Sequence, residues 1–170
     1  MPPTYSLVVP IFNEETVIPI LLRRLDALLE ALDAPGEVIV VDDGSADTSA
    51  IVIEAKARAD KRYRLIKLSR NFGHQIAITS GLDHAAGRAV IVMDADLQDP
   101  PEVVLEMIAK WKQGYDVVSA ERASRQETGD RESLLSRRGT ARRCLHSTQR
   151  RRFPPGRSPG ARLLSRHARA

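Results

Sequence analysis

The chain has 170 residues, of which 42 % are hydrophobic, and this is enough for one domain with a buried core. The single cysteine, Cys144, excludes an internal disulfide and a cysteine-based metal cluster. The first residues lack the basic and apolar regions of a signal peptide, and no apolar run approaches the roughly 20 residues of a membrane-spanning helix. The composition therefore favours a globular protein in a reducing compartment.

The net charge of +4 averages two unlike segments. Residues 1–120 carry 12 Lys and Arg against 18 Asp and Glu, whereas residues 121–170 carry 14 Arg, no Lys and 4 acids. No acidic residue follows Glu132. We therefore predict a boundary after residue 122, with a folded domain over 1–122 and an Arg-rich, mostly disordered tail over 123–170.

Apolar spacing in the first segment alternates between a strand pattern and a helix pattern. The sequence predicts a first helix that Thr16 caps, that holds Pro19 in its first turn and that continues to Leu32. Three more helices are expected over about 48–59, 74–86 and 100–113, and five strands over about 5–9, 37–41, 64–68, 89–93 and 116–120. This order predicts an α/β fold with a mainly parallel sheet and helices on both faces.

Acidic loops follow three of the predicted strands. The first loop is Pro10-Ile11-Phe12-Asn13-Glu14-Glu15, the second begins Asp42-Asp43-Gly44-Ser45, and the third begins Asp94-Ala95-Asp96-Leu97-Gln98-Asp99. In parallel sheets ligands bind outside the carboxyl ends of the strands. Carboxylates that converge there are costly unless a cation or hydrogen-bond donors compensate them, so the pattern indicates a divalent cation with a polar ligand. Oxygen ligands favour Mg²⁺ or Mn²⁺ over zinc.

Asp94 and Asp96 are two residues apart at a strand end, so both carboxylates are expected on one side. A metal bound there would bridge a pyrophosphate and stabilise it as a leaving group. The plain alternative is a pair of solvated loop acids, and the setting after an apolar strand favours the metal.

The other loops leave simpler alternatives open. The Asp42 to Ser45 segment is either a turn or a site where Asp42 accepts hydrogen bonds from a base or ribose. Glu14 and Glu15 are either ligand contacts or acids in the first turn of a helix. Arg70 is placed to face a phosphate near a helix N-terminus, while His74 is more typical of a surface residue than of a catalyst.

Five segments occur in an order that is characteristic of one family. They read VVPIFNEE, VIVVDDGSADTS, LSRNFGHQIAITSGLDHAAG, VIVMDADLQDPPE and WKQGYDVVSAER. Together they resemble family 2 glycosyltransferases of the dolichol- and polyprenyl-phosphate mannosyl- and glucosyltransferase group, closest to its bacterial branch. The resemblance spans about residues 5–122 and implies a glycosyltransferase A-type fold, with inverting transfer from a UDP- or GDP-linked sugar to a polyprenyl phosphate.

The resemblance also implies roles for single residues. Asp94 and Asp96 would be catalytic and would hold the metal and the pyrophosphate together with Gln98. The nucleotide-sugar contacts would come from the ends of strands and from two arginines, namely Pro10, Phe12, Glu14, Asp42, Asp43, Ser45, Arg70 and Arg122. A lipid phosphate acceptor is already anionic at neutral pH, so it needs positioning more than a general base.

The resemblance ends near residue 124, where an Arg-, Pro-, Ser- and Gly-rich stretch without Lys begins. One hypothesis is a shift of reading frame near residue 125 in a GC-rich gene; the other is a genuine basic tail that binds an anionic membrane surface. Specific nucleic-acid binding is not expected, because Phe153 is the only aromatic side chain there. We expect a cytoplasmic location at the inner face of the plasma membrane. The alternatives are a truncated fragment that binds donor and metal without turnover, and a nucleotidyltransferase.

Overall fold

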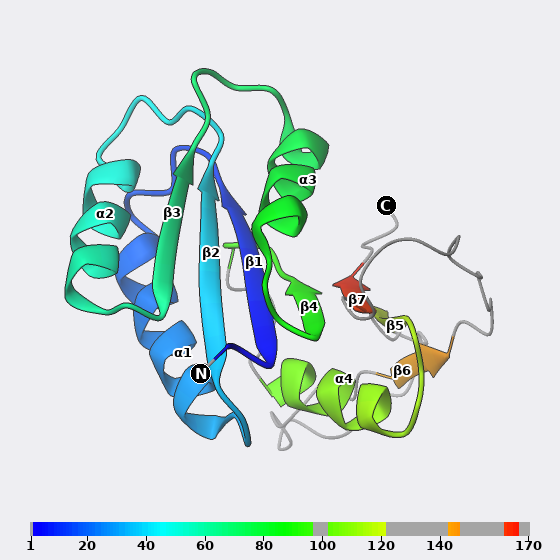
Figure 1. Cartoon of the computed structure of the whole chain (residues 1–170). Helices are drawn as coiled ribbons and strands as arrows, with labels where there is room; N and C mark the ends of the chain where they lie inside the picture. Colours follow the sequence, from blue (N-terminus) through cyan, green and yellow to red (C-terminus); the bar gives the residue numbers. More distant parts are fainter. Residues whose placement is uncertain (1, 97–101, 122–142, 147–161, 167–170) are drawn as a thin grey trace, which may run out of the picture.

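The computed structural model describes residues 2–96, 102–121, 143–146 and 162–166 (Figure 1). The strands are β1 (Tyr5–Ile11), β2 (Gly36–Asp42), β3 (Tyr63–Lys67), β4 (Ala89–Val92), β5 (Val118–Glu121), β6 (Arg143–His146) and β7 (Arg162–Arg166). The helices are α1 (Ile18–Ala31), α2 (Ser49–Ala59), α3 (His74–His84) and α4 (Glu102–Lys112). No helix of the described residues is both long enough and apolar enough to span a bilayer.

All strands form one sheet in the order β3-β2-β1-β4-β7-β5-β6. Every neighbouring pair is parallel except β5 and β6. Along β1, Tyr5 pairs with Gly36 of β2 and with Ala89 of β4, so the three strands begin level with one another. The predicted α/β fold with a mainly parallel sheet is therefore confirmed.

Helices cover both faces of the sheet, as predicted (Figure 1). One apolar cluster joins alternate residues of β1, β2 and β4 to α1, α2 and α4. The residues between them, Val8, Ile39 and Val90 among others, point to the other face and pack against α3. Gly81 lets α3 lie close to β1, since a Cβ at this position would meet Val8 Cγ1 at 2.3 Å. Both faces of the central strands are thus buried, which explains their continuous apolar runs.

The start of α1 differs from the prediction. Thr16 does not cap the helix; the residue before its first turn is Val17, which makes no side-chain capping bond. The carbonyl of Glu14 instead accepts the N–H groups of Val17 and Ile18, at 2.9 and 3.0 Å. Glu14 and Glu15 therefore precede the helix, and the alternative that they are acids of its first turn is wrong. Pro19 does lie in the first turn.

Two strands lie within the segment for which the composition predicts a disordered tail. β7 pairs with β4 and β5, and β6 pairs with β5. At these two segments the structure has strands, since a sheet edge offers unpaired N–H and C=O groups to any extended segment beside it. The rest of 123–170 lies outside the described residues, so the boundary after residue 122 stays a prediction.

The amino ends of the strands carry a buried polar cluster. Ser6 Oγ donates to Glu37 Oε1 at 2.6 Å, and the same carboxylate oxygen accepts the N–H of Ala86 at 2.9 Å. Ser6 Oγ also accepts the N–H of Gly87 at 2.8 Å, and Arg64 lies 3.5 Å from Glu37 Oε2. Glu37 is 8 % exposed, so these donors stabilise a carboxylate that has little access to water. The cluster fixes the turn that leads into β4.

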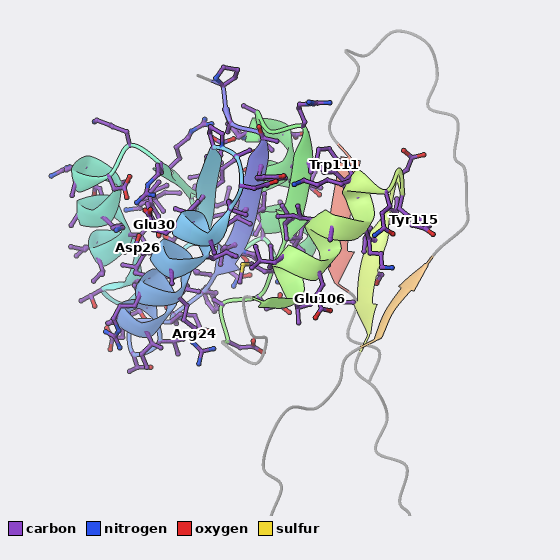
Figure 2. The ribbon with its side chains drawn as sticks, turned by 90° about the horizontal axis from the view of Figure 1, so that it is seen from below. Arg24, Asp26, Glu30, Glu106, Trp111 and Tyr115 are labelled. Carbon is purple, nitrogen blue, oxygen red and sulfur yellow. The ribbon has the colours of Figure 1, made fainter. Side chains whose placement is uncertain are left out.

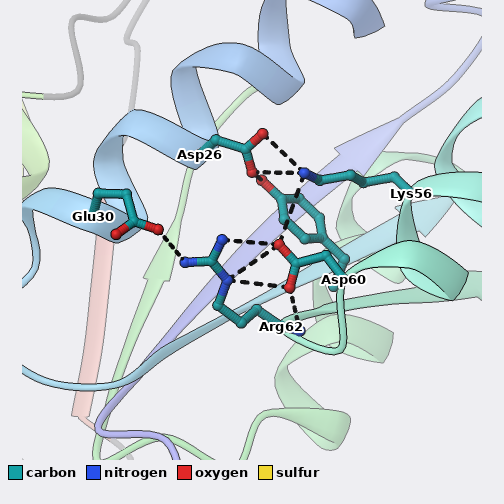
Figure 3. Close-up of polar contacts among 6 residues, drawn as sticks. Asp26, Glu30, Lys56, Asp60 and Arg62 are labelled. Atoms are coloured by element: carbon teal, nitrogen blue, oxygen red, sulfur yellow. Dashed lines mark hydrogen bonds and ion pairs between the residues drawn. The ribbon is translucent and has the colours of Figure 1, made fainter.

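A second polar cluster at this end links α1, α2 and the turn before β3 (Figure 3). Asp60 accepts hydrogen bonds from the guanidinium of Arg62, which also reaches Glu30 at 2.6 Å. Lys56 pairs with Asp26, which in turn accepts the hydroxyl of Tyr63 at 2.8 Å. Burial and the bond to Asp26 raise the pKa of Tyr63 above its ordinary range. We call these residues, Asp26, Glu30, Lys56, Asp60, Arg62 and Tyr63, the amino-end network.

Helix α4 packs beside α1 on the same face of the sheet (Figure 2). The predicted core residue Trp111 is partly buried there, with its ring edge-to-face with Tyr5 at 5.9 Å between centroids. Lys112 pairs with Asp33, whose carboxylate also accepts the hydroxyl of Tyr5. The helix ends at Lys112, and Gly114, with φ of 100°, follows in the turn after it, as its position after the helical pattern predicts.

Candidate functional site

The loop after β1 and the loop after β2 are joined by hydrogen bonds at the carboxyl edge of the sheet. Asn13, with φ of 54°, donates its N–H to Ser45 Oγ at 2.9 Å, and its side-chain oxygen accepts the N–H of Ala46 at 2.9 Å. The N–H of Glu14 donates to Ser49 Oγ, also at 2.9 Å. The left-handed backbone at Asn13 is one that Asn tolerates better than most residues. Hydrogen bonds therefore join the two loops into one surface, which we call the floor of the site.

The acids of the second loop are largely satisfied by backbone amides. Asp42 Oδ1 accepts the N–H of Ser45 at 3.0 Å, which confirms the turn alternative for this segment without excluding a ligand contact. Asp43 accepts the N–H of Phe72 at 2.8 Å and of Gly73 at 2.9 Å, both from the loop after β3. Both carboxylates are buried, at 1 % and 4 % exposure. The electrostatic need for a cation is therefore greater at the third acidic loop than here.

The loop after β3 rests directly on Gly44. A Cβ at Gly44 would lie 2.5 Å from the carbonyl carbon of Arg70, and its φ of 75° also favours glycine. The guanidinium of Arg70 stacks over the ring of Phe72, 4.5 Å from its centroid, and both side chains are exposed. An exposed cation thus stands beside the N-terminus of α3, an arrangement that favours an anion.

The third acidic loop begins where β4 ends. Asp94 Oδ1 lies 3.6 Å from His74 Nε2, with side-chain exposures of 46 % and 56 %. Asp96 is also exposed. His74 was predicted only as a first-turn surface residue; the structure places it at the start of α3 and beside Asp94, a proximity that no sequence spacing indicates. The β4 end and the α3 start therefore meet at the same edge.

The oxygen ligands at the third loop suit an open site of the kind that binds Mg²⁺, and not a site in which the protein supplies every ligand. Among the described residues, no group of three or more His, Cys, Asp or Glu is arranged to hold a metal ion. Mg²⁺ is commonly bound through one or two carboxylates, with substrate phosphates and water completing its shell. Two exposed aspartates, Asp94 and Asp96, meet that requirement. Gln98, the third predicted ligand, lies outside the described residues.

The remaining predicted contacts are distributed around this edge. Pro10 is a buried residue of β1, beyond the last residue of that strand paired with β4, so its missing N–H removes no bond on that side. Phe12 is 44 % exposed and follows β1 directly. Glu14 is half-buried and Ser45 lies in the shared floor. Arg122 lies outside the described residues.

The sequence reasoning missed the side chains that join the loops. Asn13, Asp47 and Ser49 were not singled out, although Asp47 accepts the N–H of Glu15 at 3.1 Å and of Ser49 at 2.9 Å. The hydrogen bond from Ser49 holds the pKa of Asp47 below its ordinary value. The available signal was composition, since Asn, Asp and Ser clustered in two loops often bond backbone groups.

The site thus combines a mainly parallel sheet, three acidic loops at one edge, an exposed arginine and two exposed aspartates. The model of the family "Glycosyl transferase family 2" matches residues 6–168, and the chain belongs to this family. Its fold is the glycosyltransferase A type.

Two curated relatives illustrate the similarity. The chain is 51 % identical over 121 residues to the uncharacterized glycosyltransferase YkcC of Bacillus subtilis, covering 71 % of this chain and 38 % of that protein. It is 41 % identical over 129 residues to the undecaprenyl-phosphate 4-deoxy-4-formamido-L-arabinose transferase of Salmonella paratyphi A, covering 75 % and 39 % respectively. The chain therefore spans little more than a third of the length of these relatives.

Two solved structures share the fold. TarS of Staphylococcus aureus in complex with UDP-GlcNAc superposes with a TM-score of 0.58 at 28 % identity, covering 77 % of this chain and 38 % of that one. The mannosyltransferase PcManGT of Pyrobaculum calidifontis, in complex with GDP-Man and Mn²⁺, superposes with a TM-score of 0.57 at 25 % identity, covering 73 % and 36 %.

Proposed function

We propose that this chain is the donor-binding part of an enzyme that transfers a sugar from a UDP- or GDP-linked donor to a polyprenyl phosphate. The observation that carries the proposal is the set of three acidic loops at one sheet edge in a family 2 glycosyltransferase. The relative that acts on undecaprenyl phosphate supports the acceptor class, and the neighbours with UDP-GlcNAc and GDP-Man support the donor class.

The nucleotide is proposed to lie over the floor made by the first two loops. Phe12 offers an exposed ring at its rim, and Asp42, buried just below, orients the backbone at Ser45 and is proposed to accept a hydrogen bond from the ribose or base. Pro10, Glu14 and Ser45 shape or line this floor. Arg70 would face the diphosphate, and Arg122 is proposed to join it on the resemblance alone.

Asp94 and Asp96, with Gln98, are the residues proposed to hold Mg²⁺ or Mn²⁺. When bound, such an ion neutralises the charge that develops on the leaving diphosphate. PcManGT, which has a TM-score of 0.57, was solved with Mn²⁺, and this supports the assignment.

The proposed reaction is a single displacement. An oxygen of the lipid phosphate forms a bond to the anomeric carbon, the bond from that carbon to the donor diphosphate breaks, and the nucleoside diphosphate leaves with the electron pair. The anomeric configuration inverts because attack and departure occur on opposite faces. The acceptor needs no deprotonation, so this chain has to orient the donor and stabilise its charge. The enzyme would work at the inner face of the plasma membrane, where such lipids present their phosphates, and the Arg-rich tail would contact the anionic surface.

The test is isothermal titration of the purified chain with UDP and with GDP, in Mn²⁺ and in EDTA. We expect binding that needs Mn²⁺ and that falls at least tenfold in Asp96→Ala. Asp83→Ala removes an exposed carboxylate near the other end of α3 and is the matched control. Equal binding by Asp96→Ala and wild type would overturn the metal assignment, and no binding of either nucleotide would overturn the donor assignment.

A second candidate is a fragment that binds the donor without turnover, and it is favoured by the short coverage of the relatives. Vesicles that contain undecaprenyl phosphate distinguish the two, because only an active chain produces a glycolipid and releases nucleoside diphosphate. Family membership counts against the third alternative, a nucleotidyltransferase, as does the first loop, in which residues 10–15 contain no glycine to cradle phosphates.

A further inference from the structure

The carboxylate of Asp43 binds backbone amides of a neighbouring loop and does not face solvent. Its two carboxylate oxygens accept the N–H groups of Phe72 and Gly73 at 2.8 and 2.9 Å, and the residue is 4 % exposed. A buried carboxylate is costly unless donors surround it, and these two bonds compensate the burial of Asp43. The resemblance places Asp43 among the residues that touch the nucleotide, whereas its contacts point to the loop after β3.

The bonded loop is also the start of α3. Gly73, with φ of 94°, is the residue before the helix, and its carbonyl accepts the N–H groups of Ile76 and Ala77. Within its own loop α3 has no side chain that caps it. Asp43, directly after β2, therefore supplies the carboxylate that a helix N-terminus favours. The position of the helix start depends on a residue about 30 positions earlier in the chain.

Arg70 lies between these fixed points. Its backbone rests on Gly44, and its guanidinium stacks on the ring of Phe72, whose N–H is held by Asp43. If Phe72 moves, the ring that supports the guanidinium moves with it. The direction of this exposed cation is thus set by a buried carboxylate that does not contact it in the described structure.

We propose that Asp43 is a positioning residue: it clamps the loop from Arg70 to Gly73 so that the Arg70 cation and the α3 N-terminus face the donor diphosphate. The inference rests on the proposed function, which supplies the diphosphate. It assigns the contribution of Asp43 to the diphosphate part of the donor and not to the base. If Asp43 contacted the base directly, its substitution would instead lower the affinity for the nucleoside.

The first measurement needs no nucleotide. Amide hydrogen exchange in the wild-type chain should be slower at Phe72 and Gly73 than at the adjacent Asn71, whose N–H has no acceptor within the described residues. In Asp43→Asn the side-chain NH₂ group faces one of these amides, so exchange at both should accelerate at least tenfold. Unchanged exchange would overturn the clamp.

The second measurement separates the two roles by NMR titration with UDP, GDP, uridine and guanosine. Asp43→Asn should lower the affinity for the nucleoside diphosphate that the wild-type chain binds by about tenfold. The affinity for the matching nucleoside should stay unchanged. In an Arg70→Gln background it should have little further effect, because the group that it positions is gone. Equal loss for nucleoside and diphosphate, or full additivity with Arg70→Gln, would show direct contact and overturn the proposal.

Asp60→Asn is the matched control. It also removes a carboxylate that accepts a backbone N–H, but at the amino edge of the sheet. The donor is the N–H of Arg62, at 3.0 Å. We expect it to destabilise the fold without changing nucleotide affinity or exchange at Phe72. If the wild-type chain binds no nucleotide, the proposed function and the positioning role both fail, while the exchange data still decide whether the clamp exists.

Discussion

The two edges of the sheet, at the amino and at the carboxyl ends of the strands, differ in the cations that accompany their acidic residues. At the amino edge, Asp60 and Asp26 are paired with Arg62 and Lys56 in a network of opposite charges. At the carboxyl edge, Asp42 and Asp43 are held by backbone amides, and Asp47 and Glu15 by amides and hydroxyls. Both edges stabilise carboxylates, but they use different partners.

The difference has a functional meaning. A carboxylate paired with Lys or Arg has its charge neutralised by the protein, so it attracts little else. Bonds from backbone amides to Asp42 and Asp43 instead fix the loops at the carboxyl edge against one another without any Lys or Arg. The amino edge therefore contributes to stability, while the carboxyl edge is preorganised for a ligand. Substitutions at the two edges should separate these contributions.

The largest effect is expected for Gly44→Val. The new side chain would overlap the backbone of Arg70, and a β-branched residue is strained at φ of 75°. Overlap and strain together should lower the free energy of unfolding by about 3–5 kcal/mol. Urea unfolding measures this loss, and titration should show at least a hundredfold weaker nucleotide binding.

Gly114→Val separates strain from contact. Gly114 also has a positive φ, of 100°, but a Cβ there would meet nothing within 4 Å. This control should lose only about 1–3 kcal/mol and bind nucleotide as the wild type does. Equal losses in the two variants would contradict the view that the loop after β3 rests on Gly44.

Glu37→Ala is the corresponding break at the amino edge. It leaves the buried hydroxyl of Ser6 and the part-buried N–H of Ala86 without their shared acceptor. Groups left unsatisfied in this way cost about 1–3 kcal/mol each, so a loss of about 2–4 kcal/mol is expected in urea unfolding. Nucleotide affinity, measured where the variant is still folded, should stay within twofold of wild type. A selective loss of affinity would mean that the two edges are not independent.

The sequence predicts the sheet and the helices well because their signal is local. Ile18, Leu21, Leu25 and Leu28 repeat on one helical face, and each is buried as the spacing requires. The apolar run in β2 likewise predicts a strand that is covered on both faces. The prediction that Thr16 caps α1 was wrong because the backbone carbonyl of Glu14 accepts the first N–H groups of the helix. No residue pattern in the sequence indicates such a backbone contact.

The site was predicted as a location but not as a set of contacts. Topology alone brings the ends of β1, β2 and β4 to one edge, so the acidic loops could be found from the sequence. The bond from the Gly73 N–H to Asp43 and the approach of His74 to Asp94 depend on how loops pack across 20 to 30 residues of chain. Such contacts arise from tertiary structure and leave no spacing rule, which is why Asp43 was interpreted only as a nucleotide contact.

A smaller effect than at Glu37 is expected at Arg62, and its dependence on pH identifies its cause. The hydrogen bonds from Arg62 hold the pKa of Asp60 below its ordinary value, so the charged carboxylate is favoured in the folded state. A depressed pKa adds stability above the unfolded value of about 3.9, and this contribution is lost as the pH falls through the folded value. The side chain of Arg62 is 41 % exposed and screened by water, so Arg62→Met should cost only about 1 kcal/mol at neutral pH. Urea unfolding between pH 2 and pH 7 should show the difference from wild type shrinking below pH 4.

The control is Arg58→Met, which breaks an exposed pair with Glu54 and should cost no more than about 0.5 kcal/mol. A difference at Arg62 that stays constant with pH would mean that Arg62 stabilises the turn through its packing and not through the charge of Asp60.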